Sequence, residues 1–184
     1  MKPLAENLTQ YAAYHRDRRN IATHFVGVPM IVFAIVLALT PPAFPLGAVP
    51  VSAAAIVSLL ACVYYLKLDF VFGATMAAVL FVMCAVASEV VHRLGVDAAL
   101  AVAAAIFVAG WAIQFVGHRY EGMKPAFFDD AKQLLIGPLF VLAEVIFAMG
   151  AKRGLRHYIE ERVGPTVARR DGRPIPMHDE PLQS

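Results

Sequence analysis

The sequence predicts an all-α membrane protein, a polytopic bundle in which four helices cross the bilayer and a fifth apolar segment either crosses or re-enters it. Of the 184 residues, 59% are hydrophobic and only 16% are charged, so the chain is far more apolar than an ordinary soluble domain. The mean hydropathy is +0.63. The apolar residues form runs of about 16 to 22 residues, the length that a bilayer core requires of a helix, without the period-two alternation of strands.

The first apolar run covers residues 25–39. Asn20 or Thr23 is a suitable N-cap, Pro29 can kink the helix, and residues 40–42, with two prolines, end it. Three more predicted helices and two turns follow, with helices at residues 51–66, 70–91 and 98–116 and turns at 67–69 and 92–95.

The fifth run, residues 134–149, is harder to place because a Gly-Pro pair interrupts it early and Glu144 lies within it. The basic residues favour a segment that does not cross. If it re-enters or lies in the interface, 15 of the 16 Lys and Arg residues fall on the side of the N-terminus, and only Arg93 lies opposite. If the segment crosses, eight Lys and Arg residues fall on each side of the membrane. Because cytoplasmic loops carry the excess of Lys and Arg, both termini are predicted to be cytoplasmic.

Residues 1–163 are expected to form a single integral-membrane domain, and residues 164–184 a disordered cytoplasmic tail. The membrane would be the cytoplasmic membrane of a bacterium or the endoplasmic reticulum of a eukaryote. Cys62 and Cys84 lie within apolar runs, where a thiol is usually a small hydrophobe, so no disulfide is expected. The net charge of +2 is too small to suggest a nucleic acid partner. The oligomeric state stays open.

Two short polar patches beside apolar runs hold the candidate functional residues: His15 and His24 in the first, His118 and Glu121 in the second. Four crossing helices bring both patches to one membrane boundary, so they can meet. His118 and Glu121 are three residues apart and share a helix face. His15 and His24 are nine apart and can converge only if the helix breaks between them, for which residues 16–20 are suitable. Imidazole and carboxylate groups without thiolates suit iron(II), zinc or manganese.

The other histidines and glutamates are less suitable as metal ligands. A structural or solvated role is expected for Glu89, His92, His157 and His178. Glu144 is different, because a carboxylate within an apolar run marks a functional or packing position. Asn20, Glu121 and Glu144 are therefore alternatives for the group that completes the metal site.

Several of these segments together carry a resemblance to a known family. They are Tyr14-His15, Asn20, residues 24–29, residues 111–118, Glu121, residues 124–126, residues 137–140 and Glu144. In this combination, over residues 11–149, the chain resembles the 2-hydroxy fatty acid dioxygenases, small membrane proteins that use iron(II) in fatty-acid α-oxidation. In some members the Glu lies four residues after the His, whereas Glu121 follows His118 by three.

The resemblance implies that the membrane domain is catalytic and that its cofactor is Fe(2+). The implied metal ligands and catalytic residues are His15, His24, His118 and Glu121. The substrates would be a 2-hydroxy fatty acid and dioxygen, and the products the acid one carbon shorter, carbon dioxide and water. Arg16, Arg119 and Lys124 would attract the acid group, or would simply anchor the chain at the membrane boundary.

Two other functions are compatible with the residues alone. A membrane carrier of metal ions or protons, or a scaffold, needs no reaction, but a carrier should show polar residues along its spans, where Glu89 and Glu144 are nearly alone. A zinc-dependent membrane hydrolase would use the same imidazole and carboxylate ligands. Bound iron at near one ion per chain would favour the oxygenase.

Overall fold

The computed structural model describes residues 2–41, 43–46 and 49–167, and this part of the chain is almost entirely helical. The elements are α1 Lys2–Ala13, α2 Arg18–Leu39, β1 Ala43–Leu46, β2 Val49–Ser52, α3 Ala53–Leu68, α4 Phe70–Leu94, α5 Val96–Glu121, the 3-10 helix η1 Ala126–Phe128, α6 Gln133–Ala148 and α7 Arg153–Val163. The predicted all-α class is confirmed. The short antiparallel hairpin β1–β2 is an addition that the sequence did not indicate.

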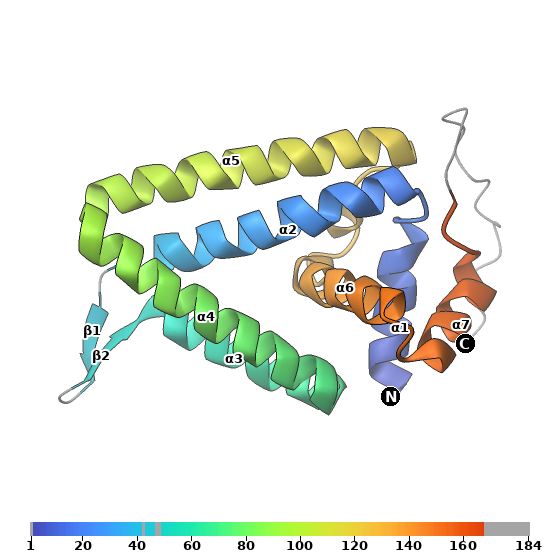
Figure 1. Ribbon diagram of the computed structural model, residues 1–184, viewed down its shortest axis with the longest axis horizontal. Helices are drawn as coiled ribbons and strands as arrows, with labels where there is room; N and C mark the ends of the chain where they lie inside the picture. The colour runs from blue at the N-terminus through green and yellow to red at the C-terminus, as the bar shows by residue number, and fades with distance from the viewer. Residues whose placement is uncertain (1, 42, 47–48, 168–184) are drawn as a thin grey trace.

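Two antiparallel helix pairs form the long part of the molecule (Figure 1). α2 packs along α5, and α3 packs along α4. The pairs meet near the hairpin and diverge toward the other end, where α6 lies between them (Figure 1). α1 and α7 pack against each other at that same end, and α1 also packs against α6. The end at which the pairs diverge therefore gathers segments from the beginning, middle and end of the chain.

α2, α4 and α5 are each long and apolar enough to cross a membrane. α6 and α7 pass the same test only together, and they are bent by 115° at their junction, as in a broken span or a re-entrant loop. The described residues thus hold three candidate spans, or four if the bent pair is one span. The predicted count of four plus a fifth is met in part, because the run 51–66 begins as strand β2 and α3 has only 16 residues.

Two predicted turns are each a single residue in the structure, because the neighbouring helices extend beyond the apolar segments and are capped locally. The turn predicted at 67–69 is Asp69 alone, whose carboxylate accepts hydrogen bonds from the backbone N–H groups of Val71 and Phe72 at 2.9 and 3.1 Å and so caps α4. The turn predicted at 92–95 is Gly95 alone, whose φ of 77° reverses the chain in one residue.

α2 begins earlier than its apolar run. Asp17 is its N-cap, with a carboxylate that accepts a hydrogen bond from the Arg19 N–H at 2.8 Å. The predicted caps Asn20 and Thr23 therefore lie inside the helix, because an acidic residue at the break satisfies the first free N–H groups before they can. Their side chains are released for contacts with α5.

The segment after α7 returns to the turn between α1 and α2. The Val167 N–H donates to the carbonyl of Arg16 at 2.9 Å, and the Val167 carbonyl accepts from the Arg18 N–H at 3.0 Å. The first residues of the predicted tail are thus paired with this turn. Residues 168–184, which include His178, lie outside the described residues.

Candidate metal centre

Three buried histidine side chains from three parts of the chain meet at the end where the helix pairs diverge. His15 lies in the turn after α1, His24 on α2 and His118 on α5. Their exposed fractions are 0%, 2% and 7%, and one ring nitrogen from each lies within 4.8 Å of the others. The helix break required between His15 and His24 is present, but it covers residues 14–17, whereas residues 18–20 of the predicted break belong to α2. The chain therefore folds so that its two polar patches meet.

Backbone carbonyls fix the orientation of two of these rings. Nδ1 of His15 lies 2.7 Å from the Tyr11 carbonyl oxygen, and Nδ1 of His24 lies 2.8 Å from the Asn20 carbonyl oxygen. A carbonyl oxygen only accepts, so each Nδ1 carries the hydrogen and each neutral ring presents a lone pair at Nε2. These two Nε2 atoms are 2.9 Å apart. Two facing lone pairs at that distance repel unless a cation, either a proton or a metal ion, lies between them.

The surroundings disfavour a proton in that position. Burial lowers the pKa of His15 well below its usual value, and the neighbouring His24 and His118 rings lower it further. The His118 ring lies 5.0 Å from His15 and 5.2 Å from His24, centroid to centroid. Its buried Nδ1 makes no well-aligned hydrogen bond among the described residues, although the Met123 backbone interacts with the ring. The ring can therefore turn a nitrogen toward a cation shared with His15 and His24.

Glu121 is buried close by, but its carboxylate is engaged with the turn that carries His15. It accepts hydrogen bonds from the N–H groups of Arg16 at 3.1 Å and Asp17 at 2.8 Å, and from the Asn20 side-chain amide at 3.1 Å. The ligand group found within the described residues consists of the three histidines. The end of α5 thus supplies one ring and also a carboxylate that holds the backbone next to a second ring.

The predicted substrate-binding cations do not line the cavity beside the histidines. Arg16 is 3% exposed and donates to the carbonyls of Ala12, His15 and Gly164 at 2.9, 3.0 and 2.8 Å, so it joins α1, the turn and the segment after α7. Arg119 is exposed.

Lys124 is also exposed, and it forms an ion pair with Asp129. It directly precedes Pro125, which does line the cavity. Arg119 likewise directly follows the cavity residue His118, so two of the three predicted cations are adjacent in sequence to the cavity lining.

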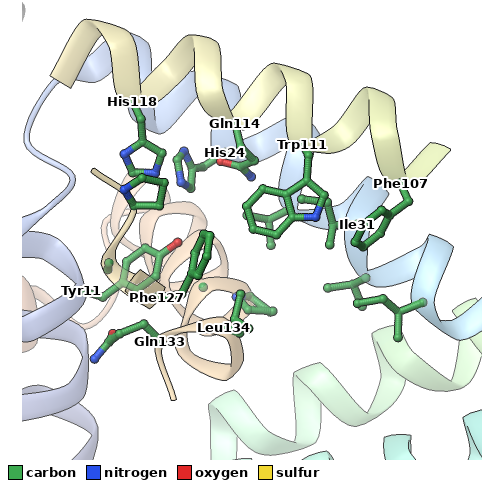
Figure 2. Close-up of a pocket in the computed structure, with 17 residues that line it drawn as sticks. Tyr11, His24, Ile31, Phe107, Trp111, Gln114, His118, Phe127, Gln133 and Leu134 are labelled. Carbon is green, nitrogen blue, oxygen red and sulfur yellow. The ribbon is translucent and has the colours of Figure 1, made fainter. Parts of the chain in front are cut away.

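A cavity of about 210 Å³ adjoins His24 and His118, between α2, α5 and the start of α6 (Figure 2). Its enclosed end is lined by buried polar or aromatic side chains, namely Tyr11, His24, Gln114, His118 and Gln133. Its other end is apolar and partly exposed, with Ile35 and Phe107 at 42% and 38%. The cavity thus has a buried polar end and an apolar end open along the helices.

Tyr11, Gln114 and Gln133 are cavity residues to which sequence reasoning gave no role. Tyr11 stacks on His15 with 4.1 Å between ring centroids and an angle of 3°. Gln114 lies four residues before His118, so its position on the same face of α5 was a usable signal. No sequence signal marked Gln133, because the loop before α6 brings it to the site.

The other candidates lie elsewhere. Glu89 takes part in an exposed ion pair on α4, and His157 on α7 faces Glu161 at 3.0 Å. His92 is near the end of α4 that adjoins α5, opposite the histidine group (Figure 1). Glu144 on α6 is half-buried and lines neither the cavity nor the group of three rings.

Comparison with known proteins agrees with the predicted resemblance. Residues 1–149 match the sequence model of the Mpo1-like family, described as 2-hydroxy-palmitic acid dioxygenase Mpo1-like. The chain is also similar to the 2-hydroxy-palmitic acid dioxygenase MPO1 of Saccharomyces cerevisiae (strain ATCC 204508 / S288c), with 30% identity over 159 residues, 85% of this chain and 87% of the yeast protein. No solved structure matches it. The chain belongs to the Mpo1-like family.

Proposed function

We propose that this protein is a membrane dioxygenase that oxidatively decarboxylates 2-hydroxy fatty acids and holds iron(II) with His15, His24 and His118. The yeast relative is named for an activity on 2-hydroxy-palmitic acid, which supports the substrate class and the use of dioxygen. The observation that carries the metal is the 2.9 Å separation of the His15 and His24 Nε2 atoms, both of which face each other as lone-pair donors.

The donor set fits a divalent transition metal. Nitrogen atoms 2.9 Å apart can bind one ion, since imidazole nitrogens lie roughly 2.0–2.1 Å from zinc, an ion of the same charge. Imidazole ligands suit iron as well as zinc, and membership of a family described as dioxygenases favours iron. Three protein ligands leave positions open for other groups, as in non-haem iron oxygenases. When bound, the iron would supply the activation of dioxygen.

The proposed reaction balances without an outside reductant. The bond between C1 and C2 of the 2-hydroxy acid breaks, C1 leaves as carbon dioxide, and C2 becomes the carboxyl carbon of the acid one carbon shorter. Dioxygen takes up all of the electrons that these two carbons lose, and water is the remaining product. The chain needs no flavin or nicotinamide site for this chemistry.

The distribution of polar and apolar side chains along the cavity resembles that of a fatty acid, which is polar at one end and apolar at the other. Its buried polar end is the proposed position of the acid head group, beside His24 and His118, and its partly exposed apolar end has room for part of the tail between α2 and α5. Apolar side chains that are exposed on a candidate span face lipid in a membrane. A substrate dissolved in the bilayer can therefore enter from the side, tail along the helices, without passing through water.

In this proposal, three further side chains or backbone groups position the histidines without binding the metal, namely those of Glu121, Asn20 and Arg16. Glu121 and Arg16 fix the turn after His15, and the Asn20 carbonyl orients the His24 ring. Hydrogen bonds from groups around a metal site set the orientation and basicity of the ligands. Glu121 can serve as a further ligand only if it gives up the hydrogen bonds described above.

Dioxygen uptake by the purified protein with iron(II) tests the proposal. Three acids of one chain length are compared, one 2-hydroxylated, one 3-hydroxylated and one unsubstituted, and the products are identified by mass spectrometry. We expect uptake with the 2-hydroxy acid alone, with release of the acid one carbon shorter. Equal uptake with the unsubstituted acid would instead indicate hydroxylation of an unactivated carbon, a reaction that needs an electron donor.

A further inference from the structure

Two glutamine side chains line the enclosed end of the cavity, and each is almost completely buried. Gln114 on α5 is 4% exposed and Gln133 at the start of α6 is 2% exposed. The amide oxygen of each has no hydrogen-bond partner among the described residues. A buried acceptor without a donor is costly. The polar end of the cavity therefore lacks an N–H or O–H group that a ligand can supply.

Gln114 is the better placed of the two. It lies one helical turn before His118 on the same face of α5, and Figure 2 shows it beside His24. Gln133 is tied to the preceding loop, because its amide nitrogen lies 3.4 Å from the Asp130 carboxylate. Of the two unpaired amide oxygens that line the cavity, the one on the same helix as a histidine of the centre is thus that of Gln114.

The packing of α2 against α5 holds the Gln114 amide in place. A Cβ atom at Gly27 of α2 would lie 2.9 Å from Gln114 Nε2 and 2.9 Å from the Gly110 carbonyl oxygen. Gly27 thus provides the space in which the amide sits, and the close helix contact leaves it little freedom to move. An amide held in this way is prepared to receive a ligand group at one position.

We infer, on the basis of the proposed function, that Gln114 determines specificity for 2-hydroxylated acids by accepting a hydrogen bond from the substrate's hydroxyl group. An ionised carboxylate only accepts hydrogen bonds, so the hydroxyl is the one donor in the head group of such an acid. An unsubstituted acid would leave the Gln114 oxygen buried without a donor. Sites built around a substrate hydroxyl reject the analogue that lacks it for this reason.

Binding without turnover tests the inference. The full-length protein in lipid nanodiscs, kept free of dioxygen, is titrated with a fluorescent fatty acid, which is then displaced by 2-hydroxy, 2-fluoro and unsubstituted acids of one chain length. Fluorine is close to a hydroxyl in size and cannot donate a hydrogen bond. We expect the 2-hydroxy acid to bind roughly ten- to a hundredfold more tightly than the 2-fluoro acid, the effect of leaving a buried acceptor unpaired.

Gln114→Met keeps the side-chain length and removes the amide, so it should bring the affinities for the 2-hydroxy and 2-fluoro acids together. Gln10→Met is the matched control, because Gln10 is an exposed residue of α1 outside the cavity, and it should keep the preference. A Gln114→Met protein that weakens all three acids equally would show that the amide only supports the packing, and the inference would be wrong.

The wild-type protein provides a second measurement, which does not depend on the folding of a variant. The preference for the 2-hydroxy acid should persist after a chelator has removed the metal, since the amide oxygen and not the metal is its source. Equal affinities in the chelated protein would overturn the inference. Failure of every acid to displace the fluorescent probe would refute the proposed function itself, whereas binding without a Gln114-dependent preference refutes only the role of Gln114.

Discussion

His15, His24 and His118 are expected to act as one unit, because each ring nitrogen depends on the others for a shared cation. Replacement of any one of them by Ala should abolish turnover and strongly reduce bound iron, while the backbone contacts that orient the remaining rings persist. Elemental analysis after gentle purification, together with dioxygen uptake, measures both effects.

His92→Ala and His157→Ala are the matched controls, because neither ring lies in the group of three. Both variants should retain iron and activity. If His92→Ala lost iron while His24→Ala kept it, the metal site would lie near the end of α4 that adjoins α5, and the proposed centre would be wrong.

Glu121→Gln should act on stability more than on the metal itself. The substitution replaces one carboxylate oxygen by an NH2 group among the N–H donors of Arg16, Asp17 and Asn20. Loss of these charge-assisted hydrogen bonds should cost about 2 kcal/mol of unfolding free energy. Thermal unfolding in the presence of a chelator measures it, since no metal contributes there.

His118→Ala is the comparison for Glu121→Gln in the same chelated samples. It should unfold close to the wild-type temperature, because it removes a ligand and not a support of the turn. A Glu121→Gln protein that keeps its stability with chelator but loses iron would identify Glu121 as a metal ligand, as the sequence had suggested.

The three histidines could be predicted from the sequence because helix parity alone places His15, His24 and His118 at one boundary. The contacts of Glu121 could not. Its spacing from His118 puts both on one face of α5, but which of them faces the metal depends on where the turn after α1 lies. Gln133 could not be predicted for a similar reason, since a loop and not a helical repeat carries it to the cavity.

At the scale of elements, the contact between α2 and α5 fixes the distance between His24 and His118. Of the glycines on α2 and α5, Gly117 has the least room for a side chain, because a Cβ atom there would overlap Thr23 Oγ1 and lie 2.6 Å from Asn20 Oδ1. Gly117→Ala should therefore separate the helices, reduce bound iron and lower the melting temperature.

Gly154→Ala is the matched control for Gly117→Ala, because no atom lies within 4 Å of a Cβ built at this helical glycine. It should leave iron unchanged and stabilise α7 by up to about 1 kcal/mol. Adding Thr23→Ala to Gly117→Ala removes the nearest atom and should recover part of the iron. Full iron content in Gly117→Ala would contradict the close contact.

The segment after α7 is expected to stabilise the turn that carries His15. Gly164 accepts a hydrogen bond from the Arg16 side chain at 2.8 Å, and Val167 pairs with the backbone of Arg16 and Arg18. A chain that ends at residue 163 loses all of these contacts, whereas one that ends at residue 167 keeps them. The shorter chain should therefore bind less iron and unfold at a lower temperature, as measured by elemental analysis and thermal unfolding. Equal behaviour of the two chains would show that the pairing is dispensable.

The helices themselves were predictable from hydropathy, but their ends were not. Asp17, Asp69 and Gly95 end or begin helices through side-chain caps or a positive φ, and these act several residues away from the limits of the apolar runs. The uniform apolar composition of residues 51–66 predicts one helix, yet the first of these residues pair in a hairpin. Apolar composition alone does not separate a short strand from a helix.

At the scale of the whole molecule, the described basic groups other than Arg93 gather at one end. The junction of α6 and α7 lies next to the turn between α3 and α4, because Lys152 forms a 3.2 Å ion pair with Asp69. α1 lies at the same end, since it packs against both α6 and α7. Arg93 lies at the opposite end, beside the start of α5. The arrangement has the charge asymmetry that positive-inside topology requires.

α6 packs against both α1 and α2, and α7 packs against α1. Near the start of α6, Gly137 lies close to Tyr11, and after its end Leu155 lines a second cavity with Leu4 and Ala5. Figure 1 shows α1 standing across the direction of α2 and α5. α6 and α7 are bent by 115° at their junction and both pack against α1, the geometry expected of a segment that returns to the boundary from which α2 departs.

Both termini should therefore lie on the cytoplasmic side, because α6 and α7 return to the boundary from which α2 departs. Reporters fused to residue 1 and to residue 184, one that works only in the cytoplasm and one only outside it, measure each location separately. A third fusion within the loop between α2 and β1 serves as the control and should report the opposite side.

If the two termini were found on opposite sides, α6 and α7 would form a true span despite their 115° bend, and the Lys and Arg residues after Ala151 would lie away from the histidine centre. The grouping of His15, His24 and His118 would survive that result, because it depends only on α1, α2 and α5.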